Sequence, residues 1–247
     1  MILFEKNHPL AGLLLLMLSQ SAFAAHPLVT DDTWTQDAGN QQLEANTDWS
    51  RQNGVASHVA DFTYTYGLLP TVDVFGDLPV TASSPHGVND ASLGIKWRFF
   101  ESGPDSLAIK PVLVLPSGNQ NQGLGTGRSS MALTLIGTRD AAPWAFHGNL
   151  GISIPRYALA ADREAHRGTL WRASAAVSYS LNEAWRAVAD IGIARNPDVG
   201  SAINPAYLLT GVIYSPGKNL DLDAGIKTGL NRAEVDHQMG VGVTWRF

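Results

Sequence analysis

Ionisable side chains recur at every second position in several short segments of the sequence. Lys96 and Arg98 form one such pair, and Asp221 and Asp223 form another. In a β-strand, this spacing places both side chains of a pair on the same face. We expect that face to line a polar interior, together with the ionisable residues Lys96, Arg98, Lys110, His147, Arg172, Arg186, Asp190, Asp221, Asp223, Lys227 and Arg246. Such charges could bind or pass a solute, or they could form salt bridges that fill the interior.

Other kinds of chemistry have weak support in the sequence. His147 and Ser153 share one strand face, but that face is the interior, where no lipid tail would reach a catalytic pair. The spacing of Asp221 and Asp223 could suggest a calcium site, but strand alternation explains the same spacing equally well. The chain has no cysteine and a net charge of −5, without a basic patch. We therefore expect no enzyme, no metal site or cofactor, and no nucleic-acid partner.

Apolar residues occupy the positions between these polar ones. In residues 91–99, for example, Leu93, Ile95 and Trp97 alternate with polar residues or glycine. Twelve segments of strand length can be marked, and most show this period of two. Hydrophobic residues make up 45% of the chain and charged residues only 16%, against about 25% in typical soluble domains. The pattern predicts a twelve-stranded antiparallel β-barrel that turns its apolar face to a membrane.

The connectors between these segments alternate in length. Short turns are expected at residues 68–71, 101–105, 140–143, 182–183 and 215–219. Mostly longer, polar loops are expected at residues 81–89, 116–127, 155–168, 196–204 and 230–235. This arrangement is typical of up-and-down barrels in the bacterial outer membrane. A secreted β-sandwich is the alternative, because alternation alone does not exclude it. Residues 206–214 are apolar on both faces, so their register stays open.

Aromatic residues gather beside the short turns and the C-terminus. They are Tyr66, Trp97, Phe99, Trp144, Tyr179, Trp185, Tyr214, Trp245 and Phe247. In a barrel they would form an outward girdle at one membrane interface, in contact with outer-membrane lipids. A soluble sandwich has no reason to collect aromatic residues at one end of every hairpin. The girdle therefore favours the barrel.

The N-terminus has the layout of a secretory signal peptide. A polar start with Lys6 precedes an apolar run at residues 10–18, and Ala22 and Ala24 are small residues at the positions a signal peptidase reads. A membrane anchor is the alternative, but the run is shorter than the roughly 20 residues that span a bilayer. We expect residues 1–24 to be removed and residues 25–247 to form the barrel domain.

Several motifs resemble a known family. They are residues 26–33, 39–40 and 42–44, then 93–99, 110–111, 115–118, 204–206, 220–223 and 227–231. Together they resemble the family named for the meta-pathway of phenol degradation, whose members are transporter-like outer-membrane barrels. The resemblance implies uptake of aromatic compounds. Residues 243–247 also resemble the C-terminal signal that the barrel-assembly machinery reads.

These observations lead to one expected function and two alternatives. The expected function is passive uptake of a small solute across the outer membrane of a Gram-negative bacterium. One alternative is a structural or sensing barrel without an open channel, and the other is a lipid-modifying enzyme. The sequence leaves open whether the lumen is plugged, and whether residues 116–127 or 155–168 fold inward.

Overall fold

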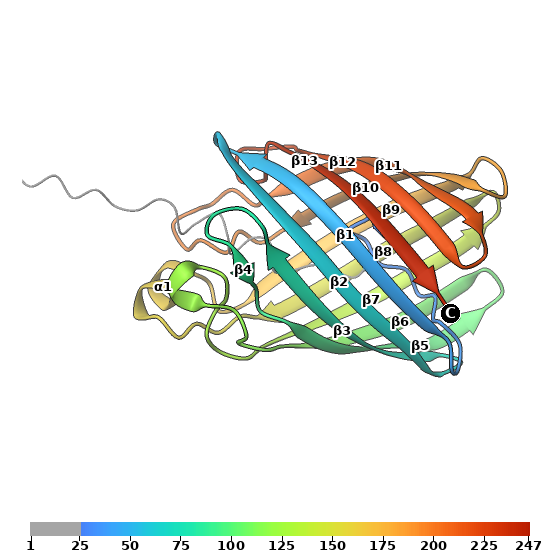
Figure 1. The fold of residues 1–247 in the computed structure, drawn as a ribbon, viewed down its shortest axis with the longest axis horizontal. Coiled ribbons are helices and arrows are strands. Elements are labelled where there is room, and N and C mark those ends of the chain that lie inside the picture. Colours follow the sequence, from blue (N-terminus) through green and yellow to red (C-terminus); the bar gives the residue numbers. More distant parts are fainter. Residues whose placement is uncertain (1–25) are drawn as a thin grey trace, which may run out of the picture.

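A closed antiparallel β-barrel accounts for most of the chain in the computed structural model, which describes residues 26–247. The predicted signal peptide lies outside the described residues. The barrel wall has twelve long strands: β1 (Gln41–Gln52), β2 (Val55–Leu69), β3 (Val72–Thr81), β5 (Ser92–Ser102), β6 (Asp105–Val114), β7 (Ser130–Ala141), β8 (Trp144–Ile154), β9 (Leu170–Ser180), β10 (Trp185–Ala194), β11 (Ala206–Gly217), β12 (Leu220–Gly229) and β13 (His237–Arg246). Figure 1 shows them tilted around a common axis.

The barrel closes where its first and last strands meet. β1 pairs with β2 on one side and with β13 on the other, in a register that runs from Gln42 opposite Arg246 to Arg51 opposite His237. The backbone of Phe247 continues this ladder, with hydrogen bonds of 2.9 and 3.0 Å to Gln41. A sheet in lipid must close in this way, because unpaired backbone groups cost several kcal/mol each. The prediction of a twelve-stranded barrel is confirmed.

The two faces of the wall differ as the alternation predicts. On β5, the outward-facing Leu93 and Trp97 are about half exposed, whereas the inward-facing Ser92 is buried. Across the barrel, large apolar side chains are exposed on the outside while serine, threonine and charged residues are buried inside. Among the described residues, no helix is long and apolar enough to cross a membrane.

The two ends of the barrel differ as well. Short turns form one rim, where aromatic rings pair between neighbouring strands. Trp144 lies 4.5 Å from Tyr179 between ring centroids, and Trp185 lies 4.6 Å from Tyr214. The longer loops lie at the other end and carry the two-residue β4 (Gly87–Val88), a 3-10 helix (Gln120–Gln122) and α1 (Ala160–Ala165). Figure 1 places β4 and α1 together at that end.

β11 has an inner face that is apolar, which is why its register could not be fixed from the sequence. Leu209 and Ile213 are buried at 3% exposure and point inward with Tyr207, while Leu208 points outward. The reason lies in what covers the inner face. A Cβ added to Gly211, in the middle of β11, would lie only 2.6 Å from the Cγ of Pro27. The inner face of β11 therefore packs against protein rather than water.

Candidate functional site: an occluded lumen

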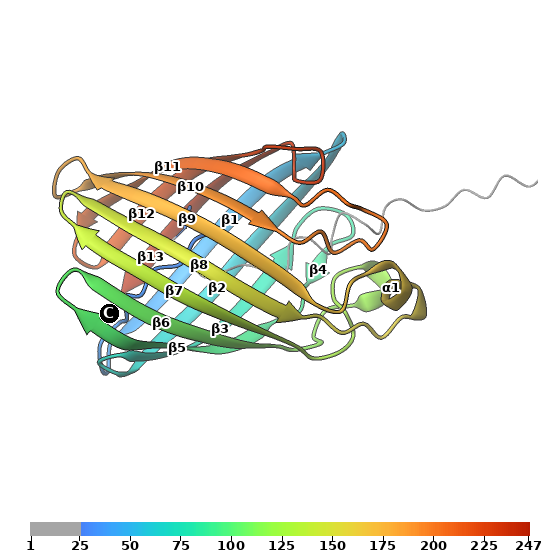
Figure 2. The ribbon, with the colours of Figure 1, turned by 180° about the vertical axis from the view of Figure 1, so that it is seen from behind.

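Residues 26–40, here called the N-terminal segment, run through the interior of the barrel to its short-turn rim, where residues 37–40 are exposed and the chain enters β1. Thr30, Asp31 and Thr33 are at most 1% exposed, although none of them belongs to a helix or strand. Their hydrogen-bond partners are inward-facing residues of β5 to β10, the wall that faces the viewer in Figure 2. The lumen is therefore occupied by the chain's own N-terminal residues.

Asp190 on β10 is the main hydrogen-bond acceptor for this segment. The backbone N–H groups of Val29 and Thr30 both donate to Asp190 Oδ2 at 2.7 Å. The Thr30 hydroxyl donates to Oδ1 at 2.8 Å, and the Tyr207 hydroxyl donates to the same oxygen at 3.0 Å. Asp190 thus collects four donors in a site where its side chain is almost fully buried. Three of the four donors belong to the N-terminal segment.

A second group of contacts fixes the segment farther along the chain. The Thr33 N–H donates to Thr138 Oγ1 at 3.1 Å, and the Thr33 hydroxyl lies 2.5 Å from that of Ser106. The Trp34 ring meets His147 edge to face, with centroids 5.4 Å apart. His147 also contacts Thr138 through Nδ1 at 3.0 Å. His147 thus contacts both Trp34 of the segment and Thr138 of the wall.

Asp31 forms the charged centre of the segment. It makes salt bridges with Lys110 on β6 and with Lys96 on β5, the latter at 3.4 Å between Nζ and Oδ1. Burial raises the pKa of the Asp31 carboxyl, but the charges of Lys110 and Lys96 outweigh burial and hold the pKa below its usual range. Asn149 on β8 donates to the Asp31 carbonyl at 3.3 Å. The predicted lumen residues Lys96 and Lys110 therefore bind the segment.

A row of glycines makes room for the start of the segment. Gly211, Gly225 and Gly240 lie opposite one another across β11, β12 and β13. A Cβ on Gly225 would lie 2.6 Å from Pro27 Cβ, and one on Gly240 would lie 2.6 Å from His26 Nε2. Real Cβ atoms do not approach other atoms so closely, so side chains at these positions would displace the segment.

His26 lies between two carboxylates at the end of this row. Its Nδ1 contacts Asp223 on β12, and its Nε2 lies 3.6 Å from Asp48 on β1. Burial lowers the pKa of His26, but hydrogen bonds and charges from Asp223 and Asp48 outweigh burial and raise the pKa to about 9. His26 is therefore an imidazolium at neutral pH.

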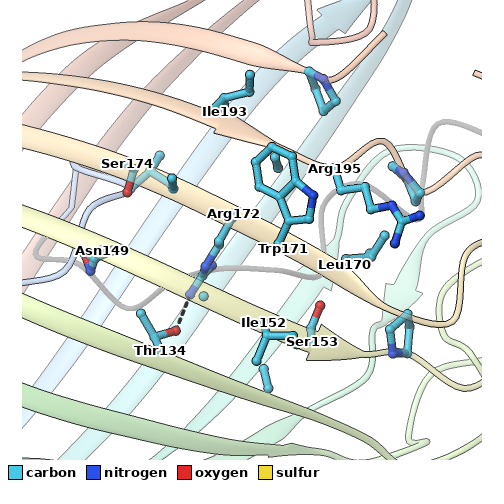
Figure 3. Close-up of a pocket in the computed structure, with 18 of the residues that line it drawn as sticks. Thr134, Asn149, Ile152, Ser153, Leu170, Trp171, Arg172, Ser174, Ile193 and Arg195 are labelled. Carbon is cyan, nitrogen blue, oxygen red and sulfur yellow. Dashed lines mark hydrogen bonds between the residues drawn. The ribbon is translucent and has the colours of Figure 1, made fainter. Parts of the chain in front are cut away.

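The other predicted lumen residues pair with one another, with other residues of the wall or with loops. Asp221 accepts from Arg246 at 2.8 Å and lies 3.5 Å from Arg186, near the short-turn rim. Two further bridges join Lys227 to Glu234 and Arg98 to Glu101, both at 3.3 Å. Arg172 on β9 points toward β7 and donates to Thr134 at 2.9 Å (Figure 3). No group of three metal-ligating side chains occurs within residues 26–247.

Two cavities flank the N-terminal segment. One has a volume of about 200 Å³ and is lined by Val29, Arg172, Tyr207 and residues of the long loops, such as Tyr157. Part of its lining is drawn in Figure 3. The other, about 970 Å³, opens toward the short turns and is lined by Asp31, Trp34 and the neighbouring wall. The segment thus divides the lumen into a loop-side and a turn-side chamber.

The sequence did not predict this arrangement. Residues 26–33 carry no strand or helix period, so the sequence marks them only as a family motif after the predicted signal peptide. It offers residues 116–127 and 155–168 as the loops that could fold inward. In the structure these two loops bond to each other, through a bridge between Gly127 and Tyr157. The sequence carries one signal for it: ionisable residues at every second position face the interior, and buried charges there need partners of opposite charge.

A model of a protein family matches residues 26–247, and its description is "Putative MetA-pathway of phenol degradation". The match begins with the N-terminal segment and ends with the last residue of the barrel. The chain belongs to this family. The resemblance of the sequence motifs to the phenol-degradation family is thereby confirmed. A comparison of the sequence with curated proteins found no match.

Solved structures share the fold of this phenol-degradation family member. An outer membrane channel from Pseudomonas putida F1 superimposes with a TM-score of 0.66 at 15% identity, covering 87% of this chain and 98% of that one. The KdgM porin gives 0.62 at 8% identity, covering 83% and 99%, and the NanC porin gives 0.61 at 7%, covering 83% and 98%. These structures show that the chain has the fold of outer-membrane β-barrels, and its apolar outer face agrees with the predicted location in the outer membrane.

Proposed function

We propose that the protein is a channel for passive diffusion of a small solute across the outer membrane. The observation that carries this proposal is a closed barrel with an apolar exterior and a polar lumen that holds a chamber on each side of the N-terminal segment. Twelve strands enclose a lumen wide enough for a small molecule. Solved structures with the same fold include an outer membrane channel and a porin, which supports the proposal.

An aromatic compound is the solute class that fits the loop-side chamber best. The chamber has a volume of about 200 Å³, and a cavity of about 150 Å³ is enough to hold benzene. Tyr207 and Leu170 contribute apolar surface, while Arg172 and Ser174 contribute polar atoms that suit a hydroxyl or carboxyl substituent. The family description, which mentions phenol degradation, points to the same class.

The charged residues of the lumen have two roles in this proposal. Lys96, Lys110 and Asp190 hold the N-terminal segment, which narrows the path. Arg186, Asp221 and Arg246 form an ion-pair group that sets the electrostatic potential of the turn-side chamber. A solute would pass after the segment moves away from the wall. We propose no catalytic step.

A non-conducting barrel is the second candidate, and the burial of Thr30, Asp31 and Thr33 favours it. In that case the N-terminal segment would be a permanent part of the core. The barrel would then serve a structural or sensing role. The two candidates differ in whether the segment ever leaves its place in the lumen.

Assembly into the membrane would use the C-terminal strand and the aromatic girdle. Trp245 and Phe247 are exposed on the outside with their ring centroids 4.6 Å apart. Such rings suit the membrane interface, where outer-membrane lipids would contact them. We propose that the barrel-assembly machinery reads β13 and Phe247 during biogenesis.

Transport is tested with the refolded protein and with cells. In planar bilayers and swelling liposomes, the channel should give discrete conductance steps and speed the entry of small aromatic carboxylates over sugars of similar size. A deletion strain should grow more slowly than its parent when a single aromatic compound at low concentration is the carbon source. A folded barrel that neither conducts nor speeds solute entry would support the non-conducting candidate.

A further inference from the structure

Basic side chains gather on the outer face of the barrel where β13, β1 and β2 meet, close to the loop end. Figure 1 shows these three strands on the near wall. Arg51 on β1 lies directly opposite His237 on β13, and Trp49, two positions back along β1, lies opposite His58 on β2. Arg51, Trp49 and His237 are exposed, whereas Ser50 on the other face of β1 is buried. These four side chains, Arg51, His237, Trp49 and His58, are here called the outer basic patch, and they face away from the lumen.

The patch is held together by contacts between neighbouring strands. The His58 ring stacks on Trp49, with centroids 4.9 Å apart and planes 13° from parallel, and its Nε2 lies 2.7 Å from the Thr47 hydroxyl. Directly opposed residues of an antiparallel pair have Cβ atoms about 4.5–5.5 Å apart, and diagonal neighbours about 7–8 Å, which long side chains can span. The Arg51 guanidinium can therefore share one ligand with His237 beside it and with His58 on the diagonal.

No carboxylate neutralises this patch from within the described part of the chain. Arg51 and His237 form no ion pair there. The nearest acid in the sequence, Asp236, accepts the Asn53 N–H at 2.9 Å, and its charge is offset by Arg232, which is exposed in the same loop. The remaining carboxylates on β1, β2 and the loop before β13 lie on the lumen side, and they are Glu44, Asp48, Asp61 and Glu234.

The opposite rim of the barrel treats its outward charge differently. Arg139 on β7 is also exposed on the outside, near the short turns, but it binds Asp105 of β6 at 3.2 and 3.3 Å. At about 3.4 Å per residue, Arg51 lies about 7 Å beyond Trp49 toward the loop end. Tryptophan belongs to the membrane interface, so Arg51 reaches the level of the lipid headgroups. An outward arginine without a carboxylate partner suits a leaflet whose lipids carry the anion.

We propose that the outer basic patch binds the phosphate groups of a phosphorylated glycolipid of the lipid A type. The long loops of such barrels are extracellular, so the patch lies in the outer leaflet, where this lipid is found. The guanidinium of Arg51 presents a planar fork of N–H donors that matches a phosphate. Thr228 on β12, directly opposite His237, adds a hydroxyl, and the exposed Met239 and Val241 contact the acyl chains nearer the middle of the barrel. The proposal rests on the outer-membrane location and not on solute transport.

Binding is measured by native mass spectrometry of the refolded barrel in detergent. The protein is titrated with diphosphorylated lipid A, with the same lipid after its phosphates are removed, and with phosphatidylglycerol. The phosphorylated glycolipid should bind about 10- to 100-fold more tightly than the dephosphorylated form, the range that one hydrogen bond to a charged group gives. Equal binding of the two forms overturns the proposal. Binding of phosphatidylglycerol as tight as that of lipid A also overturns it, because the patch would then be a general site for anionic lipids.

Variants at the two rims separate the patch from the barrel as a whole. Arg51→Gln should weaken lipid A binding about 10-fold, and Arg51→Lys, which keeps the charge without the planar fork, should weaken it less. Arg139→Gln is the matched control and should bind as the wild type does, because Arg139 is outward and exposed at the other rim. Heat-modifiable migration on gels shows that each variant is folded. An unchanged affinity in Arg51→Gln, or an equal loss in Arg139→Gln, refutes the proposal. A barrel that binds lipid A in this way but does not conduct would refute the channel and leave the glycolipid site standing.

Discussion

The substitution Asp190→Asn should release the N-terminal segment from the barrel wall. Asp190 accepts two backbone N–H groups through Oδ2, from Val29 and Thr30, and the Thr30 hydroxyl through Oδ1. An asparagine with its oxygen in place of Oδ2 keeps the two backbone bonds without the charge, but its –NH2 group in place of Oδ1 can only donate, so the Thr30 hydroxyl loses this acceptor. The side chain keeps its size, so the variant changes hydrogen bonding rather than packing.

The size of the effect follows from these three bonds. A hydrogen bond to a charged group contributes about 1.5–3 kcal/mol, and a neutral one about 1 kcal/mol. Two bonds each lose about 0.5–2 kcal/mol of charged contribution, and one bond of about 1.5–3 kcal/mol is lost, so docking weakens by about 3 kcal/mol at the lower end of this range. Since 1.4 kcal/mol corresponds to a factor of ten, the displaced state should become about 100-fold more populated.

Single-channel recording measures this change directly. In planar bilayers, Asp190→Asn should show high-conductance openings far more often than the wild type. Asp221→Asn is the control, because Asp221 lies on the same inner wall but contacts Arg246 and Ser215 rather than the segment. An Asp190→Asn barrel that is folded but opens as rarely as the wild type would refute the reasoning, as would an equal effect in the control.

Three further predictions concern the same segment and the barrel's closure. The Thr33→Cys/Ser106→Cys pair, at positions whose hydroxyls are 2.5 Å apart in a chain without cysteine, should form a disulfide that abolishes large openings until reductant is added. Because the docked pKa of His26 is raised to about 9 from 6.5, its contribution to docking is complete below about pH 6.5 and is lost as pH rises through 9. Recordings from pH 6 to 10 should therefore show openings increasing, and His26→Gln should weaken that dependence. Gly225→Ala should press on Pro27 and raise the frequency of channel opening about 5- to 100-fold, from about 1–3 kcal/mol of overpacking. Gly148→Ala is the control and should leave the opening frequency unchanged, because the nearest atom to its added Cβ is 4.0 Å away. Equal opening frequencies in the two variants would contradict the packing argument.

The wall of the barrel could be predicted from the sequence because strand alternation is a local property. Leu93, Ile95 and Trp97 face outward and Lys96 faces inward because a pleated strand in lipid must separate the two kinds of side chain. The aromatic girdle and the alternation of short turns with long loops follow from the same physics. Even the number of strands is contained in the count of alternating segments.

The N-terminal segment could not be predicted in this way, because only the tertiary structure decides where it lies. Asp31 meets Lys110 and Thr30 meets Asp190 across separations of 79 and 160 residues, and no local period reports such contacts. The apolar inner face of β11 is explained by Pro27, which lies against Gly211 and Gly225, while Gly240 makes room for His26. Closure of the barrel creates a polar interior whose unmatched charges need partners, and the chain meets that need with its own N-terminal residues.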